Sequence, residues 1–229
     1  MLVIKNIIMT NIKTEFYNAN EAFNYFYKEI NDNGVKFDNT RALFNIGFTL
    51  HKPLDNHIKS EIRKWNHFYA ESEWQWYLTG DPSIDALGSL YGKIPPIWEN
   101  MADCNREVRS NYGFQWKRKG QLNYAIQKLK DKKNTRHAVI SIFDGKEASS
   151  RYMFDTPCTC AVHFQVVDNK LNMSVMMRSN DMWYGFPIDQ YCFSKLQQMV
   201  AEQVDIPVGT YYHFATNLHL YEDKLISKI

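Results

Sequence analysis

The sequence predicts an α+β fold organised as one domain over residues 1–229. A chain of 229 residues with 45% hydrophobic and 15% aromatic residues is long and apolar enough for one sizeable core. Helical and strand-like patterns both occur, but the strand-like segments mostly do not alternate with helices as βαβ units do. No repeat, low-complexity tract or Gly/Ser-rich linker marks a domain boundary.

Several segments have the apolar spacing of amphipathic helices. These segments are residues 18–34, 54–80, 120–133 and 188–204. In the second, the spacing of Ile58, Ile62, Trp65 and Tyr69 predicts one buried face, and Gly80 is a natural helix end. We therefore expect a long helix there.

Strand-like segments occupy much of the remaining chain. They are residues 41–50, 136–143, 209–221 and the stretch 160–179, which reads as two strands joined by a turn at "DNK". Together with the helices they predict a mixed sheet packed by helices.

Bulk charge and cysteine spacing exclude some classes of function. A net charge of +2 implies no large nucleic-acid footprint. No long apolar run or signal peptide is present, so we expect a cytoplasmic protein without membrane contact. The four cysteines lack zinc-ribbon spacing, because Cys158 and Cys160 are separated by one residue. We expect no metal.

Single residues suggest chemistry without establishing it. Cys158 follows a proline at a strand entrance, where a cysteine is often an inert buried thiol. Arg178 and Ser179 together suit a phosphate, although an isolated arginine is more often a surface ion pair. Asp189 stands among apolar residues at a helix start, where it is either an N-terminal cap or a functional acid.

Five motifs in order resemble the thymidylate synthase superfamily. The longest is "DTPCTCAVHFQVVDNKLNMSVMMRSNDMWYGFPID", in which Arg178 follows Cys158 by twenty residues, as in the family. The others are "EWQWYLTGD", "PIWENMADCNREVRSNYGFQW", "NTRHAVISIF" and "HFATNLHLY". The resemblance implies a thymidylate synthase-like mixed sheet that dimerises through its face.

The resemblance also implies catalytic residues. Cys158 would add to carbon 6 of a pyrimidine nucleotide, and carbon 5 would then accept the one-carbon unit of 5,10-methylenetetrahydrofolate. Glu73 would organise water and relay protons, and Tyr112 would support that network. Asp181 and Trp98 would contact the folate.

Further residues would bind the nucleoside monophosphate. Arg178 and Ser179 would hold the phosphate, with Arg136 supplied by the second subunit of a homodimer. The family's arginine pair is Arg136-His137 here, and Arg41 is the candidate for an earlier phosphate arginine. The sugar hydroxyl would be bound by a further pair, His219 and Tyr221.

Asp189 departs from the family pattern, in which asparagine reads uracil. An acid that shares a proton with the ring satisfies the cytosine edge, whereas a charged acid beside uracil leaves a mismatch costing about 1–3 kcal/mol. Thr159 in place of histidine, and the "MRSND" and "SNYG" stretches, resemble the phage deoxycytidylate hydroxymethylases. In that reaction water adds to the exocyclic methylene, and tetrahydrofolate leaves unoxidised.

The leading hypothesis is therefore dCMP 5-hydroxymethylation by a phage-encoded enzyme acting in the host cytoplasm to make a modified DNA precursor. The alternatives are dUMP hydroxymethylation, thymidylate synthesis and CMP hydroxymethylation. A non-catalytic nucleotide-binding homologue is a further possibility, because a fold does not imply a function.

Overall fold

The computed structural model describes residues 12–145 and 155–226. Most of the N-terminal stretch from which the sequence predicted no signal peptide lies outside these ranges. The strands are β1 (Glu15–Phe16), β2 (Val35–Phe37), β3 (Thr40–Leu50), β4 (Val139–Ser141), β5 (Thr159–Val167), β6 (Lys170–Met177), β7 (Asn180–Asp181) and β8 (Val208–Tyr221). The helices are α1 (Ala19–Asn33), α2 (His67–Thr79), α3 (Ile84–Tyr91), α4 (Pro96–Met101), α5 (Tyr112–Lys117), α6 (Gln121–Asp131) and α8 (Phe186–Val204), with short 3₁₀ turns at Arg118–Gly120 and Glu222–Lys224.

The described strands form one mixed sheet in the order β1-β3-β8-β6-β5-β4, with β2 paired to β3 and β7 to β8. The β3–β8 and β5–β6 pairs are antiparallel, whereas β6 and β8 run parallel. The predicted mixed sheet is confirmed, and so are the predicted hairpin of β5 and β6 and the strand at β8. The strand predicted over 136–143 is shorter, at Val139–Ser141.

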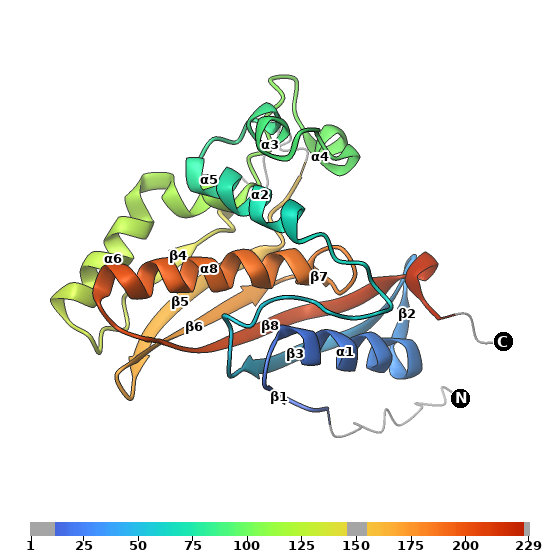
Figure 1. The fold of residues 1–229 in the computed structure, drawn as a ribbon, viewed down its shortest axis with the longest axis horizontal. Helices are drawn as coiled ribbons and strands as arrows, with labels where there is room; N and C mark the ends of the chain where they lie inside the picture. Colours follow the sequence, from blue (N-terminus) through green and yellow to red (C-terminus); the bar gives the residue numbers. More distant parts are fainter. Residues whose placement is uncertain (1–11, 146–154, 227–229) are drawn as a thin grey trace.

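Helices α1 and α8 lie across the sheet in Figure 1. Along β8, the side chains of Tyr211, His213 and Ala215 are fully buried, whereas Tyr212 is 41% exposed. This period of two places one face of β8 in the core. The core includes the fully buried Phe48 of β3.

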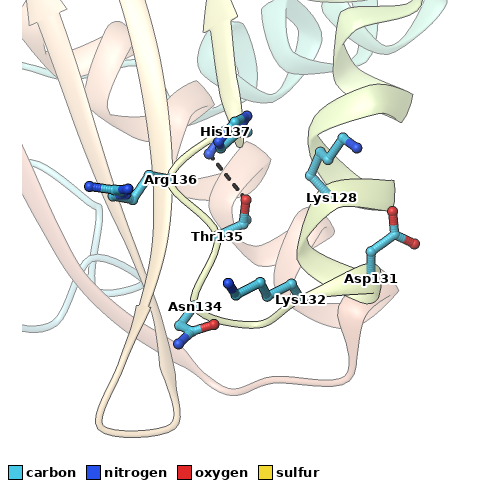
Figure 2. Close-up of a pocket in the computed structure, with 7 residues that line it drawn as sticks. All are labelled: Lys128, Asp131, Lys132, Asn134, Thr135, Arg136 and His137. Atoms are coloured by element: carbon cyan, nitrogen blue, oxygen red, sulfur yellow. Dashed lines mark hydrogen bonds between the residues drawn. The ribbon is translucent and has the colours of Figure 1, made fainter.

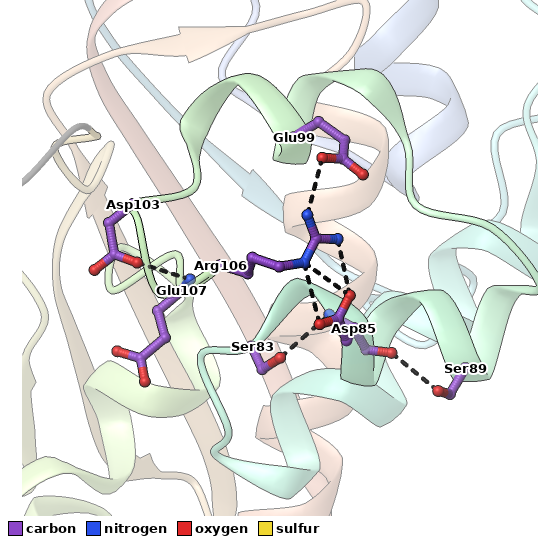
Figure 3. Close-up of polar contacts among 7 residues, drawn as sticks. All are labelled: Ser83, Asp85, Ser89, Glu99, Asp103, Arg106 and Glu107. Carbon is purple, nitrogen blue, oxygen red and sulfur yellow. Dashed lines mark hydrogen bonds and ion pairs between the residues drawn. The ribbon is translucent and has the colours of Figure 1, made fainter.

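A layer of helices, α2 to α5, lies above α8 in the view of Figure 1. Arg106 ties two of them together: its guanidinium binds Asp85 of α3 at 2.8 Å and Glu99 of α4 at 3.4 Å (Figure 3). Ser83 caps α3 by accepting from the Asp85 amide. These contacts hold α4, which carries Trp98, against the rest of the layer.

The long helix predicted over 54–80 is wrong in its first half, because the helix spans only His67–Thr79 and starts at the cap Asn66. The preceding segment instead makes tertiary contacts: Asn56 donates to Ser194 of α8 at 2.8 Å, and the Lys59 amide donates to Asn20. Ile58 is buried as predicted, but Ile62 is 52% exposed. Long-range hydrogen bonds therefore outweigh the local apolar spacing.

Candidate active site

Cys158 and Arg178 lie side by side at one end of the β5–β6 hairpin. Thr159, the first residue of β5, pairs with Met177, the last residue of β6, so their outer neighbours face each other. The Arg178 amide donates to the Cys158 carbonyl at 2.8 Å, and Arg178 Nη2 lies 3.7 Å from Cys158 Sγ. The predicted spacing of twenty residues is thus the length of one hairpin.

The thiol of Cys158 is set in a mixed electrostatic environment. Burial raises its pKa to about 11, and the carboxyls of Asp189 and Asp155 act in the same direction. The Arg178 guanidinium opposes them by favouring the thiolate. With a pKa of about 11 the thiol is mostly protonated at neutral pH, and Arg178 is the cation placed to favour its ionisation.

Asp189 lies in the first turn of α8, next to Asn180 of β7. Asn180 Nδ2 donates to Asp189 Oδ2 at 2.7 Å. A Cβ on Gly185 would lie 3.1 Å from this oxygen and 3.2 Å from Asn180 Nδ2, so glycine leaves room for the hydrogen bond. The N-terminal cap interpretation does not hold, since Gly185 occupies the cap position and Asp189 is already inside the helix.

The surroundings of Asp189 favour the protonated form of its carboxyl. Burial raises its pKa well above the ordinary value, and the nearby Glu73 raises it further, against the opposing hydrogen bond from Asn180. A charged Asp189 would leave a mismatch beside uracil. A neutral acid carries one donor and one acceptor, so it satisfies either base, depending on which oxygen bears the proton.

Glu73 is buried, 4% exposed, on α2. Tyr77 donates to Glu73 Oε1 at 2.5 Å, and burial raises the pKa of the carboxyl above its ordinary value. Tyr69 also hydrogen-bonds to Glu73 and in turn accepts from Trp98 Nε1 at 2.7 Å. The predicted Glu73 and Trp98 are thus joined through Tyr69, which the sequence indicated only as a residue of a buried helix face.

Tyr112 begins α5 and is buried beside the same group of residues. Burial raises the pKa of its phenol well above the ordinary value, with Asp189 and Cys158 contributing in the same direction. The next residue, Gly113, lets α5 approach α2, because a Cβ there would lie 2.1 Å from the Tyr77 carbonyl oxygen. Glu73, Tyr112, Asp189 and Cys158 therefore lie near one another.

Asp181, His219 and Tyr221 lie together at the β7–β8 pair. Asp181 is the register partner of His219, whose ring packs edge-on against Tyr221 with centroids 5.5 Å apart. The Asp181 carboxylate accepts from the amides of Trp183 and Tyr184, yet burial raises its pKa to about 6. This acid titrates close to neutral pH.

Arg63 is a site neighbour that the sequence analysis missed. It lies in the segment wrongly predicted as helix, donates to the Trp183 carbonyl and stacks over the Trp183 ring at 5.9 Å. Its charge opposes the rise in the pKa of Asp181. Arg63 lies outside the quoted motifs, so nothing in the sequence indicated its place near the site. The tertiary path of residues 54–66 brings it there.

The proposed phosphate residues are placed differently from one another. Arg178 donates to the main-chain carbonyls of Thr156 and Pro157, and Ser179 is half-buried beside it. Arg41 donates to the Asn31 carbonyl at 2.9 Å, so its guanidinium already holds the end of α1. Arg41 nevertheless lies at the sheet end that carries Tyr221, since its neighbour Thr40 pairs with that residue.

Arg136 does not lie near Cys158 of the same chain. Extending the β4–β5 register, in which Val139 faces His163, puts Arg136 about eight residues along β5 from Cys158, or roughly 26 Å. Figure 2 shows it pointing away from Lys128 and Asp131. It lines a separate cavity of about 250 Å³, with Lys128, Asp131, Lys132, Asn134, Thr135 and His137.

The site has features suited to a folate. Trp98 is half-buried and offers aromatic surface, packed at 5.3 Å against the Trp76 ring, and Asp181 offers a titratable carboxyl. Within residues 12–145 and 155–226, no cluster of histidine, cysteine or acidic side chains could hold a metal ion. Over the same ranges no helix has the length and apolarity needed to cross a bilayer.

Comparison with known proteins gives the family. The family model described as thymidylate synthase matches residues 23–227. A deoxyuridylate hydroxymethyltransferase of Pseudomonas phage M6 is 29% identical over 179 residues, covering 76% of this chain. The chain spans about half the length of that relative, since the match covers 50% of it.

The fold is likewise that of a solved relative. Thermostable thymidylate synthase A from Bacillus subtilis superposes with a TM-score of 0.76 at 21% identity, covering 89% of this chain and 80% of that one. This similarity confirms the predicted thymidylate synthase-like mixed sheet packed by helices. The family match across residues 23–227 shows that the chain belongs to the thymidylate synthase family.

Proposed function

We propose that this protein transfers a hydroxymethyl group to carbon 5 of a pyrimidine deoxynucleoside monophosphate. The observation that carries the proposal is the Cys158–Arg178 pair beside Asp189, whose pKa is raised by burial, and a buried Glu73. The name of the phage relative supports hydroxymethyl rather than methyl transfer. The net reaction joins the nucleotide, the one-carbon unit and water without any oxidation.

In this proposal Cys158 is the nucleophile. Its sulfur bonds to carbon 6 of the base, which makes carbon 5 nucleophilic, and the bond breaks again when the product is released. Arg178 favours the thiolate needed for attack. Arg178 and Ser179 also bind the nucleotide phosphate, which brings that dianion close to the same guanidinium.

Glu73 handles protons and water. Burial raises the pKa of its carboxyl, so it is protonated more readily than an exposed one and is suited to relay protons. It would hold the water that adds to the exocyclic methylene, and Tyr112 would support proton removal from carbon 5. When bound, methylenetetrahydrofolate supplies the one-carbon unit and leaves as tetrahydrofolate; Trp98 and Asp181 would hold it.

The base has two candidates, each with its own observation. The phage relative is named for deoxyuridylate, which makes dUMP the first candidate. The second candidate is dCMP, because Asp189 stands where the family pattern described above has the asparagine that reads uracil. His219 and Tyr221 would bind the sugar hydroxyl, and Arg41 would stabilise the phosphate end of the site.

A homodimer would complete the phosphate site. Arg136 lies too far from Cys158 within one chain, so a partner subunit would have to supply it. The sheet offers a surface for such pairing: Met176 of β6 is 50% exposed and Tyr212 of β8 is 41% exposed. Large exposed apolar side chains on neighbouring strands are suited to burial between subunits.

We also propose that residues 1–229 act as one catalytic domain.

The test is incubation with 5,10-methylenetetrahydrofolate and, separately, dUMP, dCMP and CMP. Mass spectrometry of the product separates hydroxymethyl from methyl transfer, and absorbance detects dihydrofolate. We expect a hydroxymethyl nucleotide and no dihydrofolate. A Cys158→Ser variant with full activity would overturn the mechanism.

A further inference from the structure

A chain of three buried polar side chains ends on the half-buried Asp189, the proposed base reader. Tyr211 and His213 lie two residues apart on β8, so they point to the same face. The Tyr211 hydroxyl lies 3.0 Å from His213 Nδ1, His213 Nε2 lies 3.1 Å from Asn180 Oδ1, and Asn180 Nδ2 lies 2.7 Å from Asp189 Oδ2. We refer to Tyr211, His213 and Asn180 as the relay.

The relay is isolated from solvent. Tyr211 and His213 are fully buried and Asn180 is 2% exposed. The His213 ring stacks on Phe48 with centroids 5.1 Å apart and meets Phe186 edge-on at 5.4 Å. Burial lowers the pKa of His213 to about 3, so the imidazole is neutral and has one donor nitrogen and one acceptor nitrogen. Buried polar groups of this kind require specific partners.

These partners fix the direction of every hydrogen bond. Because the Asn180 amide nitrogen faces Asp189, its oxygen faces His213 and can only accept. His213 Nε2 must therefore carry the hydrogen, which leaves Nδ1 as the acceptor for the Tyr211 hydroxyl. At the other end Asp189 Oδ2 accepts from Asn180. In the protonated carboxyl this favours the proton on Oδ1, because a carbonyl oxygen is a stronger acceptor than a hydroxyl oxygen.

We propose that Asn180, oriented by His213 and Tyr211, is a positioning residue that fixes Oδ1 of Asp189 as the proton-bearing oxygen and thereby sets which pyrimidine the enzyme prefers. This inference rests on the proposed function and gives it a physical basis for base selection. A freely rotating neutral acid would read either edge, since uracil and cytosine present the same two groups in opposite order. With the relay in place, the carboxyl of Asp189 presents its donor and its acceptor in one fixed order. The base that needs the opposite order is then mismatched both at ring position 3 and at the group on position 4.

The first test measures the relay itself, without any substrate. Nitrogen NMR on protein labelled at its histidines reports which ring nitrogen of His213 carries hydrogen, and a His213→Gln variant assigns the signal. We expect the neutral form with hydrogen on Nε2 in the wild type and a shifted Nε2 signal in Asn180→Ala. Hydrogen on Nδ1 would overturn the proposal, because the relay would then run in the opposite direction.

The second test compares the dCMP to dUMP ratio of kcat/KM among variants. His213→Gln keeps an N–H donor for Asn180, and we expect a ratio within threefold of wild type. His213→Leu and Asn180→Ala break the relay, and we expect the preference for the favoured base to shrink at least tenfold. Asn56→Ala is the matched control, because it also removes a buried amide, one that donates to Ser194 instead.

The outcomes separate the two proposals. If the wild type converts no pyrimidine nucleotide, hydroxymethyl transfer is wrong, while the His213 signal still decides the direction of the relay. The dCMP to dUMP affinity ratio, measured by calorimetry, then replaces the kinetic ratio. If Asn180→Ala and His213→Leu keep the wild-type ratio within twofold, the relay does not set base preference. Folding is checked by thermal unfolding, and Tyr211→Phe serves as the mildest relay variant.

Discussion

Arg178 Nη2 lies 3.7 Å from Cys158 Sγ, and the same guanidinium donates to the two carbonyls that precede the cysteine, those of Thr156 and Pro157. The arginine assigned to phosphate from the sequence thus also positions the turn that carries the thiol. One cation serves the nucleophile and its loop, and the proposed phosphate contact would be added on the same side chain.

The first prediction concerns the reactivity of Cys158. Because its pKa is about 11, only the small thiolate fraction reacts, and we expect iodoacetamide alkylation to accelerate about tenfold per pH unit between roughly pH 8 and 10. Arg178→Met removes the favourable charge and should slow alkylation further at each pH. Peptide mapping measures the rate at Cys158, with the exposed Cys104 as internal control. A pH-independent rate at Cys158 would contradict this account of the thiol.

The second prediction concerns base choice at Asp189. Asp189→Asn introduces the family's amide. We expect the ratio of kcat/KM for dUMP to kcat/KM for dCMP to rise by about 10- to 100-fold, because a mismatch at the base edge costs about 1–3 kcal/mol. Steady-state kinetics with each nucleotide gives the ratio. An unchanged ratio would remove Asp189 as the reader of the base.

The third prediction concerns Glu73. Glu73→Gln keeps the shape and the hydrogen bond from Tyr77 but removes the titratable proton. We expect kcat to fall by about 10²- to 10⁴-fold with little change in nucleotide binding, as for loss of a general acid–base group. Nucleotide affinity from calorimetry is the control. A fall in affinity that accounts for the whole loss would assign Glu73 to binding.

The fourth prediction tests the partner arginine. Arg136→Ala and Cys158→Ser are each expected to be nearly inactive, but mixing them after reversible dissociation should restore about a quarter of wild-type activity, since half the dimers would contain one intact site. Each variant taken through the same procedure alone is the control. Absence of restored activity, with mixed dimers detected by native mass spectrometry, would place Arg136 outside the active site.

The fifth prediction concerns stability and pH. The pKa of Asp181 is about 6 in the folded protein and 3.8 as an ordinary side chain. Between these values the unfolded chain releases this proton while the folded protein retains it, so Asp181 lowers the free energy of unfolding as pH rises through this window. Asp181→Asn should flatten the slope between pH 4 and 6 in denaturant titrations. An unchanged slope would mean that the carboxyl is not held protonated by the fold.

Much of the fold is predictable from local patterns. The apolar face of α1 and the hairpin of β5 and β6 follow from spacing within single segments. The failure over residues 54–66 has a tertiary cause, since Asn56 and Arg63 bond to partners more than a hundred positions away. Apolar spacing contains no information about such partners.

The site, like the fold, is predictable where the information lies within a local motif. Motif order identified Cys158, Glu73 and Asp189, which the structure brings together, because each lies at a fixed place in the motifs. The relay was missed, although Asn180 and His213 both stand within quoted motifs. Only the pairing of β7 with β8 puts them in one line with Asp189.

The most direct test of the central claim is the identity of the product and of the spent folate. Wild-type protein is incubated with 5,10-methylenetetrahydrofolate and dUMP or dCMP in water enriched in heavy oxygen. We predict a nucleotide whose new hydroxymethyl group carries the heavy oxygen, with tetrahydrofolate as the folate product. A methylated nucleotide formed together with dihydrofolate would contradict the account and assign the protein to thymidylate synthesis.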